Sequence, residues 1–260
     1  SSCSLVGSEM CIRDRFKSDK GLRRSNNEDA CFVLLPDNVY LVADGVGGGN
    51  AGEIASRTAV NEIAGYIASN PIEHATNKYA VVNYLQDCID KTNEKIFNQA
   101  LKYEENKGMA TTLAIVYAKE GRAYIANIGD SRVYLYRDEE LTQLTEDHTY
   151  VNTLLKAGII SKEQAEVDER KNVITKALGA EDTVEPDFFQ VNIMEGDIFL
   201  ICTDGLYDEV DSKEMIDVLK ENGSMSDVCN KMIEKANNNG GHDNITVICL
   251  RVTEEDIHEQ

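Results

Sequence analysis

The chain has 260 residues, of which 42% are hydrophobic and 28% are charged, and this length is enough to bury a sizeable core in one domain. Forty-six acidic residues against 26 basic ones give a formal charge of −20, which disfavours nucleic acid and anionic membrane surfaces as partners. We interpret most of this excess as a solvated acidic surface, in part cancelled by bound divalent ions. No apolar run approaches the roughly 18 residues that span a bilayer, so a soluble protein is expected.

Residues 1–15 lack the long apolar core of a signal peptide and resemble translated sequencing-adapter read-through. We predict that they are a non-native or disordered leader and that residues 16–255 form a single domain. Seven cysteines occur without a Cys-x-x-Cys pair, and several lie inside apolar runs. Reduced core thiols are therefore favoured over a disulfide framework, and the cytoplasm is the expected location.

The first half of the chain has two β-rich regions with two helical patterns between them. Residues 30–35 and 39–43 are predicted as a hairpin, followed by a glycine-rich loop. Apolar residues at helical spacing predict two long helices over residues 51–68 and 80–101. Short β-rich runs separated by turn residues then predict an antiparallel meander over residues 111–118, 122–128, 131–136 and 141–144.

In the second half of the chain, strands and helices also occur without βαβ alternation. A short helix is predicted over residues 151–157, and a hairpin around Glu195-Gly196 over residues 188–193 and 198–202. The remaining predicted elements are helices over residues 212–220 and 226–236 and a last strand over residues 245–252. Strands in hairpins with segregated helices indicate an α+β fold rather than a doubly wound sheet.

Four hydrophobic, strand-like segments run directly into or out of an aspartate beside a glycine or asparagine, at Asp44, Asp130, Asp204 and Asp243. A carboxylate at the end of a buried strand is costly to desolvate, so four at equivalent places indicate convergence on a cation. A single Asp-Gly pair is usually only a turn, but this alternative weakens with four such sites in one chain. Oxygen ligands without a histidine or cysteine pattern select Mg²⁺ or Mn²⁺ over zinc.

Arg24 lies shortly before the acidic pair Glu28-Asp29. An arginine beside a metal site suits the capture of a phosphate dianion, because its fork of donors matches two phosphoryl oxygens. The alternative interpretation is a structural salt bridge between Arg24 and Asp29.

Six ordered sequence blocks combine these residues. They are Gly21-x-x-Arg24-x-x-Asn27-Glu28-Asp29, Val42-Ala43-Asp44-Gly45-Val-Gly-Gly48 with Ala51-Gly-Glu53, Gly108-Met-Ala-Thr-Thr112, Asn127-x-Gly129-Asp130-Ser131-Arg132, Thr203-Asp204-Gly205-Leu206-x-Asp208 and Asp243-Asn244-Ile-Thr-Val247. In order and approximate spacing the blocks resemble the metal-dependent protein phosphatases of type 2C, and most of all the bacterial members. The resemblance covers about residues 16–252.

The resemblance implies a four-layer αββα fold, in which helices flank a central antiparallel β-sandwich on both sides and a metal cluster lies at one end. By the same resemblance, Asp44, Asp204 and Asp243 surround one ion. Glu28, Asp44 and the Gly45 carbonyl surround a second ion. Two ions that share a carboxylate and a water lower the pKa of that water, which then attacks phosphorus as hydroxide.

Further roles also follow only from the resemblance. Asp130 and Asp208, with Asp204, match the positions of a third metal in bacterial relatives, and Arg24 matches the phosphate-binding arginine. The implied protein is a cytoplasmic, monomeric serine/threonine phosphatase whose partners are phosphorylated proteins and a cognate kinase. Alternatives are a catalytically weak, phosphoprotein-binding regulatory relative and a specialised phosphatase for anti-sigma-factor antagonists.

Several positions depart from the pattern of the family. Val46 stands where many eukaryotic relatives carry a histidine that is a suggested general acid. His148 is the next candidate for that role, although a structural hydrogen-bonding role is favoured. Ala110 and Tyr207 stand where glycine and tryptophan are frequent. Residues 149–172 interrupt the β pattern and are expected to form the flap beside the active site.

Overall fold

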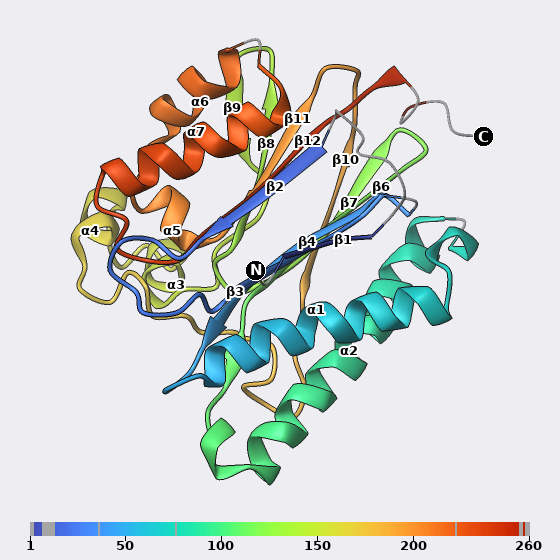
Figure 1. Ribbon diagram of the computed structural model, residues 1–260, viewed down its shortest axis with the longest axis vertical. Coiled ribbons are helices and arrows are strands. Elements are labelled where there is room, and N and C mark those ends of the chain that lie inside the picture. The colour runs from blue at the N-terminus through green and yellow to red at the C-terminus, as the bar shows by residue number, and fades with distance from the viewer. Residues whose placement is uncertain are drawn as a thin grey trace.

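Two β-sheets and a set of outer helices make up the fold in the computed structural model (Figure 1). The structure describes residues 3–6, 14–35, 37–75, 77–221, 223–254 and 257. The first sheet has the strand order β1-β3-β4-β6-β7-β10, with β5 paired to β4, and the second has the order β2-β12-β11-β8-β9. All neighbouring strands are antiparallel except β1 and β3, which are parallel.

The strands of the first sheet are β1 (Cys3–Val6), β3 (Asp29–Leu34), β4 (Val39–Val46), β5 (Ala110–Thr111), β6 (Leu113–Lys119), β7 (Arg122–Ile128) and β10 (Asp187–Asn192). Those of the second sheet are β2 (Asp14–Asp19), β8 (Arg132–Arg137), β9 (Glu140–Gln143), β11 (Ile198–Cys202) and β12 (Ile245–Arg251). The helices are α1 (Ala51–Ser69), α2 (Lys78–Lys102), α3 (Tyr150–Lys156), α4 (Lys162–Val167), α5 (Asp204–Tyr207), α6 (Ser212–Lys220) and α7 (Met225–Asn238), with 3₁₀ turns η1 (Ile72–His74) and η2 (Glu104–Asn106).

Apolar side chains of the described residues form three clusters that join these elements. Ile63 of α1 and Leu113 of β6 belong to the cluster between the first sheet and α1 and α2. Tyr40 of β4 and Phe199 of β11 belong to the cluster between the two sheets. Met232 of α7 belongs to the cluster between the second sheet and α5, α6 and α7. Both faces of each sheet are therefore covered, and central strands such as β3 and β11 are buried along their whole length.

Helix ends follow the local sequence. The Asn77 side chain accepts a hydrogen bond from the Ala80 amide at the start of α2. Capping boxes begin α4 at Ser161, α6 at Asp211 and α7 at Ser224. Such caps satisfy amides that have no partner within the helix, which explains why the starts of α2, α6 and α7 lay close to the predicted ones.

Two predicted strand pairings were wrong. The expected meander is divided, because β6 pairs with β7 in the first sheet whereas β8 pairs with β9 in the second. The expected hairpin of residues 188–193 and 198–202 does not form, because β10 pairs with β7 and β11 lies between β12 and β8. In both places a short connection crosses from one sheet to the other. Period-2 patterns fix which side chains are buried but not which strand is the neighbour.

The N-terminal region also differs from the expectation. Residues 3–6 form β1, and β2 begins at Asp14, so residues 1–15 include strand residues that the prediction left outside the fold. The other residues of this region lie outside the described part of the chain. Among the cysteines, Cys88, Cys202, Cys229 and Cys249 are free and buried, as predicted, whereas Cys31 is disulfide-bonded.

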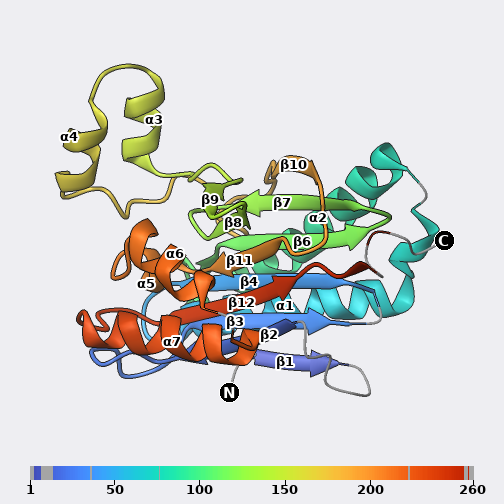
Figure 2. The same ribbon diagram turned by 90° about the horizontal axis from the view of Figure 1, so that it is seen from above.

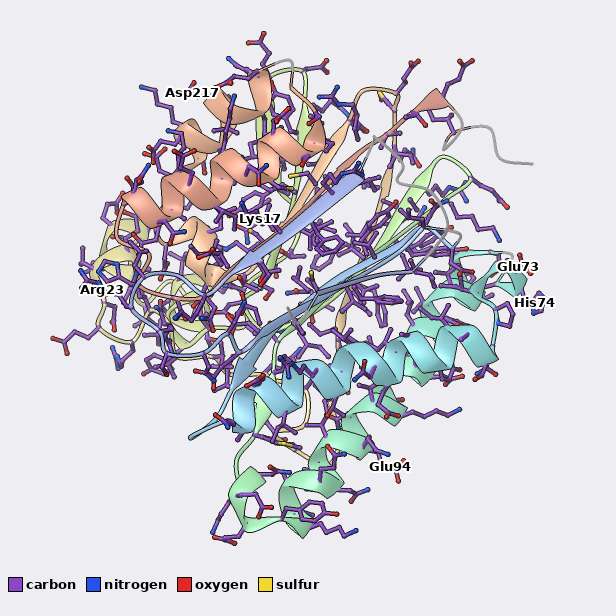
Figure 3. All side chains as sticks on the ribbon, in the orientation of Figure 1. Lys17, Arg23, Glu73, His74, Glu94 and Asp217 are labelled. Carbon is purple, nitrogen blue, oxygen red and sulfur yellow. The ribbon has the colours of Figure 1, made fainter. Side chains whose placement is uncertain are left out.

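The acidic excess lies largely on the outside of the molecule. Figure 3 shows Glu94 pointing away from α2 and Asp217 pointing away from α6, and both side chains are exposed. This agrees with the interpretation of a solvated acidic surface. Within the described residues, no helix combines the length and the apolar character needed to cross a membrane.

The flap is a separate feature of the fold. Its helices α3 and α4 project from the body of the molecule, as Figure 2 shows. An isolated bridge between Thr149 and Ile174 closes the base of the flap. The predicted helix over residues 151–157 corresponds to α3, whereas α4 and the short α5 were not predicted as separate helices.

Candidate metal centre

Carboxylates from both sheets gather at one end of the molecule. Asp44 lies near the end of β4 and Asp130 in the turn between β7 and β8. Asp204 is the second residue after β11, and Asp243 is the second residue before β12. Burial raises the pKa of Asp44 well above its usual value, and the charges of Asp29, Asp204, Asp130 and Asp243 raise it further. The strand ends therefore bring together four of the predicted ligands, as the sequence pattern indicated.

Asp204 has a carboxylate oxygen that lacks a hydrogen-bond donor. Its Oδ1 is enclosed and accepts no hydrogen bond from any residue that the structure describes. Burial raises the pKa of Asp204 to about 6, and the neighbouring charges of Asp243 and Asp208 act in the same direction. A hydrogen bond shared with Asp44 acts in the opposite direction. An enclosed oxygen without a donor is costly unless a cation or a proton satisfies it.

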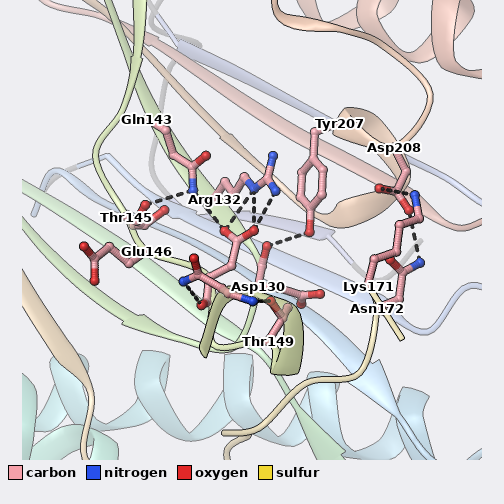
Figure 4. Close-up of polar contacts among 12 residues, drawn as sticks. Asp130, Arg132, Gln143, Thr145, Glu146, Thr149, Lys171, Asn172, Tyr207 and Asp208 are labelled. Carbon is pink, nitrogen blue, oxygen red and sulfur yellow. Dashed lines mark hydrogen bonds and ion pairs between the residues drawn. The ribbon is translucent and has the colours of Figure 1, made fainter. Parts of the chain in front are cut away.

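Asp130 shares this environment. It is 5% exposed, and burial followed by the charges of Asp204 and Asp147 raises its pKa to about 8. The Tyr207 hydroxyl donates a hydrogen bond of 2.9 Å to the backbone carbonyl of Asp130 (Figure 4). Tyr207 therefore connects α5, which begins at Asp204, to the turn that carries Asp130.

Asp29 lies beneath the candidate centre rather than in it. Its Oδ2 accepts hydrogen bonds from the hydroxyls of Thr203, at 2.8 Å, and Thr246, at 2.7 Å. These bonds tie β3 of the first sheet to the segments of the second sheet that carry Asp204 and Asp243. Asp29 is fully buried, and its pKa is raised to about 7, mainly by burial.

Arg24 lies at the rim of the candidate centre. Its Nη2 donates to Asp243 Oδ2 at 2.6 Å, and its side chain is 47% exposed. The alternative of a salt bridge between Arg24 and Asp29 was therefore wrong, because the partner of Arg24 is Asp243. The charges of Asp44 and Glu28 also raise the pKa of Arg24, which places its guanidinium close to the carboxylate cluster.

Asn244 holds the loop that carries Arg24 and Glu28. Its Oδ1 accepts from the Glu28 amide at 2.8 Å. Its Nδ2 donates to the carbonyls of Lys20 and Asn26, each at 2.9 Å. A single amide side chain next to Asp243 thus fixes the loop at both ends. The sequence interpretation did not single out this role, although Asn244 belongs to one of the six blocks.

Glu28 and the Gly45 carbonyl border the same small space. A Cβ atom placed on Gly52 would lie 2.7 Å from the Gly45 oxygen and 3.0 Å from the Glu28 carboxyl carbon. A side chain at position 52 would therefore fill the space between these two predicted ligands. The glycine keeps this space open, which is consistent with an ion bound there.

Asp208 is the predicted ligand that the flap holds. Lys171 Nζ lies 3.3 Å from its Oδ1, and Asn172 Nδ2 donates to its Oδ2 at 3.1 Å (Figure 4). Asp208 is close enough to Asp204 to raise the pKa of that carboxyl. Neither Lys171 nor Asn172 was predicted as part of the site, because no local pattern marks them.

The set of residues fits a hard divalent cation, although the side chains are held by protein partners in this structure. Within the described ranges, no group of three or more His, Cys, Asp or Glu side chains has a ready-made arrangement for a metal ion. Arg24 holds Asp243, and Lys171 holds Asp208. The fit rests on the enclosed oxygen of Asp204 and on the mutual repulsion of the gathered carboxylates, which a cation would relieve.

His148 has a structural role in this geometry. The Gly129 amide donates to His148 Nδ1 at 3.0 Å, and the Nε2 atom lies 3.0 Å from Asp187 Oδ2. Burial lowers the pKa of His148, which favours the neutral ring that accepts this bond. His148 therefore supports the turn before Asp130, which agrees with the structural interpretation rather than with a general acid.

This site of clustered carboxylates with an arginine at the rim, at one end of two facing sheets, defines a metal-dependent phosphoryl hydrolase. A family model described as protein phosphatase 2C matches residues 22–246. The chain belongs to the protein phosphatase 2C family.

Relatives and solved structures agree with this membership. Serine/threonine phosphatase stp of Listeria welshimeri is 40% identical over 238 residues, which are 90% of this chain and 94% of that protein. Protein phosphatase PhpP of Streptococcus pneumoniae is 37% identical over 242 residues, with 92% and 97% covered. The Mycobacterium tuberculosis phosphatase PstP/Ppp has a TM-score of 0.85 at 33% identity, covering 93% of this chain and 99% of that chain.

The family depends on Mn²⁺ or Mg²⁺. A structure of the PstP catalytic domain in complex with two manganese ions is similar to this chain, with a TM-score of 0.82 and 33% identity over 93% of this chain and 98% of that chain. The preference for a hard cation that was predicted from the oxygen ligands is therefore confirmed.

Proposed function

We propose that Glu28, Asp44, the Gly45 carbonyl, Asp204 and Asp243 hold two Mn²⁺ or Mg²⁺ ions, and that Asp130 and Asp208 are available to a third. The protein is a serine/threonine phosphatase, and phosphorylated proteins are its substrates. The observation that carries the site assignment is the enclosed Asp204 oxygen within a cluster of carboxylates. When bound, the ions supply a water of lowered pKa as the nucleophile for phosphorus.

The chain's own residues bind and orient the substrate. Arg24 is partly exposed at the rim, where its guanidinium can bind two phosphoryl oxygens. Asn244 holds the Arg24 loop in place, and Asp29 holds Thr203 and Thr246 beneath the ligands. These residues keep the ligands and the phosphate-binding group in register before the substrate arrives.

The buried thiols are not nucleophiles in this scheme. Burial raises the pKa of Cys88 and Cys202 to about 12, so both remain protonated near neutral pH. A protonated, enclosed thiol is a poor nucleophile. This supports direct attack by water rather than a cysteinyl-phosphate intermediate.

The proposal also covers the layer arrangement, the domain bounds, the cellular location and the oligomeric state. The three apolar clusters support a four-layer αββα arrangement, and we propose that residues 16–255 form a single phosphatase domain, to whose sheets strand residues before position 16 also pair. We also propose a cytoplasmic monomer that reverses the action of a cognate kinase. A catalytically weak phosphoprotein-binding role is not favoured, because the predicted ligands and Arg24 are all present.

A direct assay tests the proposed chemistry. We expect Mn²⁺ to support hydrolysis of phosphoserine and phosphothreonine peptides and excess chelator to abolish it, with phosphotyrosine peptides turned over far more slowly. Phosphate release is measured for the three peptides side by side. Turnover that persists in chelator, or a preference for phosphotyrosine, would contradict the proposed reaction.

Arg24→Ala tests the role of the rim arginine. Loss of a charge-assisted hydrogen bond to phosphate costs about 1.5–3 kcal/mol, so we expect KM for a phosphopeptide to rise by about ten- to a hundredfold, with a smaller change in kcat. Arg23→Ala removes an exposed arginine of the same loop, labelled in Figure 3, and serves as the matched control. An unchanged KM in Arg24→Ala would show that Arg24 does not bind the phosphate and has only a structural contact with Asp243.

A further inference from the structure

The side chain of Tyr207 contacts the turn that carries Asp130 at two points. Its hydroxyl donates to the Asp130 carbonyl at 2.9 Å, and the Arg132 guanidinium carbon lies 3.5 Å from the centre of its ring (Figure 4). The second contact is a cation stacked on an aromatic face. Position 207 departs from the family pattern, in which tryptophan is frequent, and tryptophan has no hydroxyl. The hydrogen bond to Asp130 therefore depends on the tyrosine of this chain.

Neighbouring groups fix the ring of Tyr207. The ring packs against the apolar cluster that joins the second sheet to α5, α6 and α7. Arg132 is itself held, because its Nε and Nη2 donate to the Asp147 carboxylate at 3.0 and 2.6 Å and its Nη1 donates to the Tyr134 hydroxyl at 2.9 Å. A side chain that is held by packing and by fixed neighbours presents its hydroxyl in one place.

The turn around Asp130 is also held from other parts of the fold. The Gly129 amide donates to His148 Nδ1 at 3.0 Å, and the Gly129 carbonyl accepts from the His148 amide at 2.9 Å. The Ser131 hydroxyl lies 2.7 Å from the Thr112 hydroxyl. These contacts come from the segment before α3 and from the segment between β5 and β6, whereas the bond to the Asp130 carbonyl comes from α5.

The segment of α5 carries two of the proposed ligands. Asp204 begins the helix, and the Asp208 amide donates to the Asp204 carbonyl at 2.9 Å. Residues four positions apart in a helical turn lie on the same face. The charge of Asp208 raises the pKa of Asp204, and the charge of Asp204 raises that of Asp130, so the three carboxylates lie close together. Tyr207 thus belongs to the segment of two ligands and binds the backbone of the third.

We infer that Tyr207 is a positioning residue, which holds Asp130 in place relative to the two aspartates of the α5 segment and so raises the affinity of the three carboxylates for a divalent cation. The inference rests on the proposed function, in which these carboxylates are available to a third ion. Tyr207 is not itself a ligand, because it acts through the backbone of Asp130. Ligands that are held in place before the ion arrives lose less conformational entropy when they bind it.

Tyr207→Phe tests this role, because it removes the hydroxyl and keeps the ring beside Arg132. Mn²⁺ alone is titrated into the metal-free protein, and the free ion is measured by electron paramagnetic resonance. We expect the weakest Mn²⁺ site of the unmodified protein to lose about tenfold in affinity in the variant, the effect of one hydrogen bond, while the tighter sites stay within about twofold. The absence of a third, weaker site from the unmodified protein would overturn the inference.

Tyr84→Phe is the matched control. The Tyr84 hydroxyl also donates to a backbone carbonyl, that of Asn70, at 2.5 Å, but Tyr84 lies on α2 and packs against the cluster that joins this helix to the first sheet. Thermal unfolding in chelator should show that both variants fold, with a similar small loss of stability. Only Tyr207→Phe should lose Mn²⁺ affinity. An equal loss in Tyr84→Phe, or no loss in Tyr207→Phe, would overturn the positioning role.

Phosphopeptide kinetics at saturating Mn²⁺ separate this role from substrate binding. We expect KM of Tyr207→Phe to stay within about twofold of that of the unmodified protein, because Tyr207 acts on the ion's ligands and not on the substrate. A raised KM confined to this variant would overturn the inference. Mn²⁺ binding as expected in a protein without any turnover would overturn the proposed reaction and leave the positioning role standing. An unmodified protein that binds no Mn²⁺ would overturn both.

Discussion

Asp44→Asn is expected to reduce phosphopeptide turnover by about three orders of magnitude or more, because it removes the charge of the carboxylate that we propose as a shared metal ligand, and metal catalysis contributes several kcal/mol. Asparagine keeps the volume of the side chain and removes its charge. Asp44 is surrounded by other carboxylates, so the metal-free variant should be at least as stable as the metal-free parent. Turnover and thermal unfolding with and without Mn²⁺ measure both effects.

Asp217→Asn is the control for the change of charge. Asp217 is exposed on α6, and Figure 3 shows its side chain pointing away from that helix. This variant should keep normal turnover and the normal stabilisation by Mn²⁺, whereas Asp44→Asn should lose both. Turnover of Asp44→Asn within about tenfold of the parent would refute the assignment of Asp44 as a shared ligand.

The second large effect concerns the stability of the metal-free protein as a function of pH. The pKa of Asp29 is raised to about 7 and that of Asp130 to about 8, whereas the usual pKa of an aspartate side chain is 3.8. A raised carboxyl pKa means that the folded state binds a proton that the unfolded chain has released. Its contribution to stability is therefore complete below pH 3.8 and is lost as pH rises through the folded value.

In chelator, the melting temperature is thus expected to fall between pH 6.5 and pH 8, the interval in which Asp29 and Asp130 lose their protons. The lowered pKa of His148 acts in the opposite direction only below its ordinary value of 6.5, so it does not mask the fall. Saturating Mn²⁺ should reverse the trend, because deprotonated carboxylates bind the ion more tightly. A melting temperature that rises with pH in chelator would show that the carboxylates are not crowded as described.

The sequence determined much of the candidate site. Asp44, Asp204 and Asp243 stand at the ends of hydrophobic runs, and these runs are strands of two facing sheets whose ends lie together. The run of apolar residues is local information, because it marks a strand that is buried on both faces, and the aspartate marks where that strand ends. The family resemblance, which rested on six blocks, was confirmed by the comparisons.

Sequence patterns did not determine which partners these residues meet. One of the two interpretations of the pattern paired Arg24 with Asp29, only five positions away, but the structure pairs Arg24 with Asp243 from the far end of the chain. Likewise, Lys171 and Asn172 contact Asp208 without any motif that marks them. Such contacts depend on the relative placement of distant segments, which local periodicity does not encode.

The connections that cross between the sheets also show that local patterns do not determine which segments meet. The chain itself specified a buried strand over residues 198–202 and a short turn before it, and both are present. Only the tertiary structure decided that β11 joins β12 and β8 rather than β10, and that the flap lies against α5 and α6 to enclose a cavity. The physical reason is that burial is a property of each residue, whereas strand pairing and cavity walls are properties of segments brought together by the whole fold.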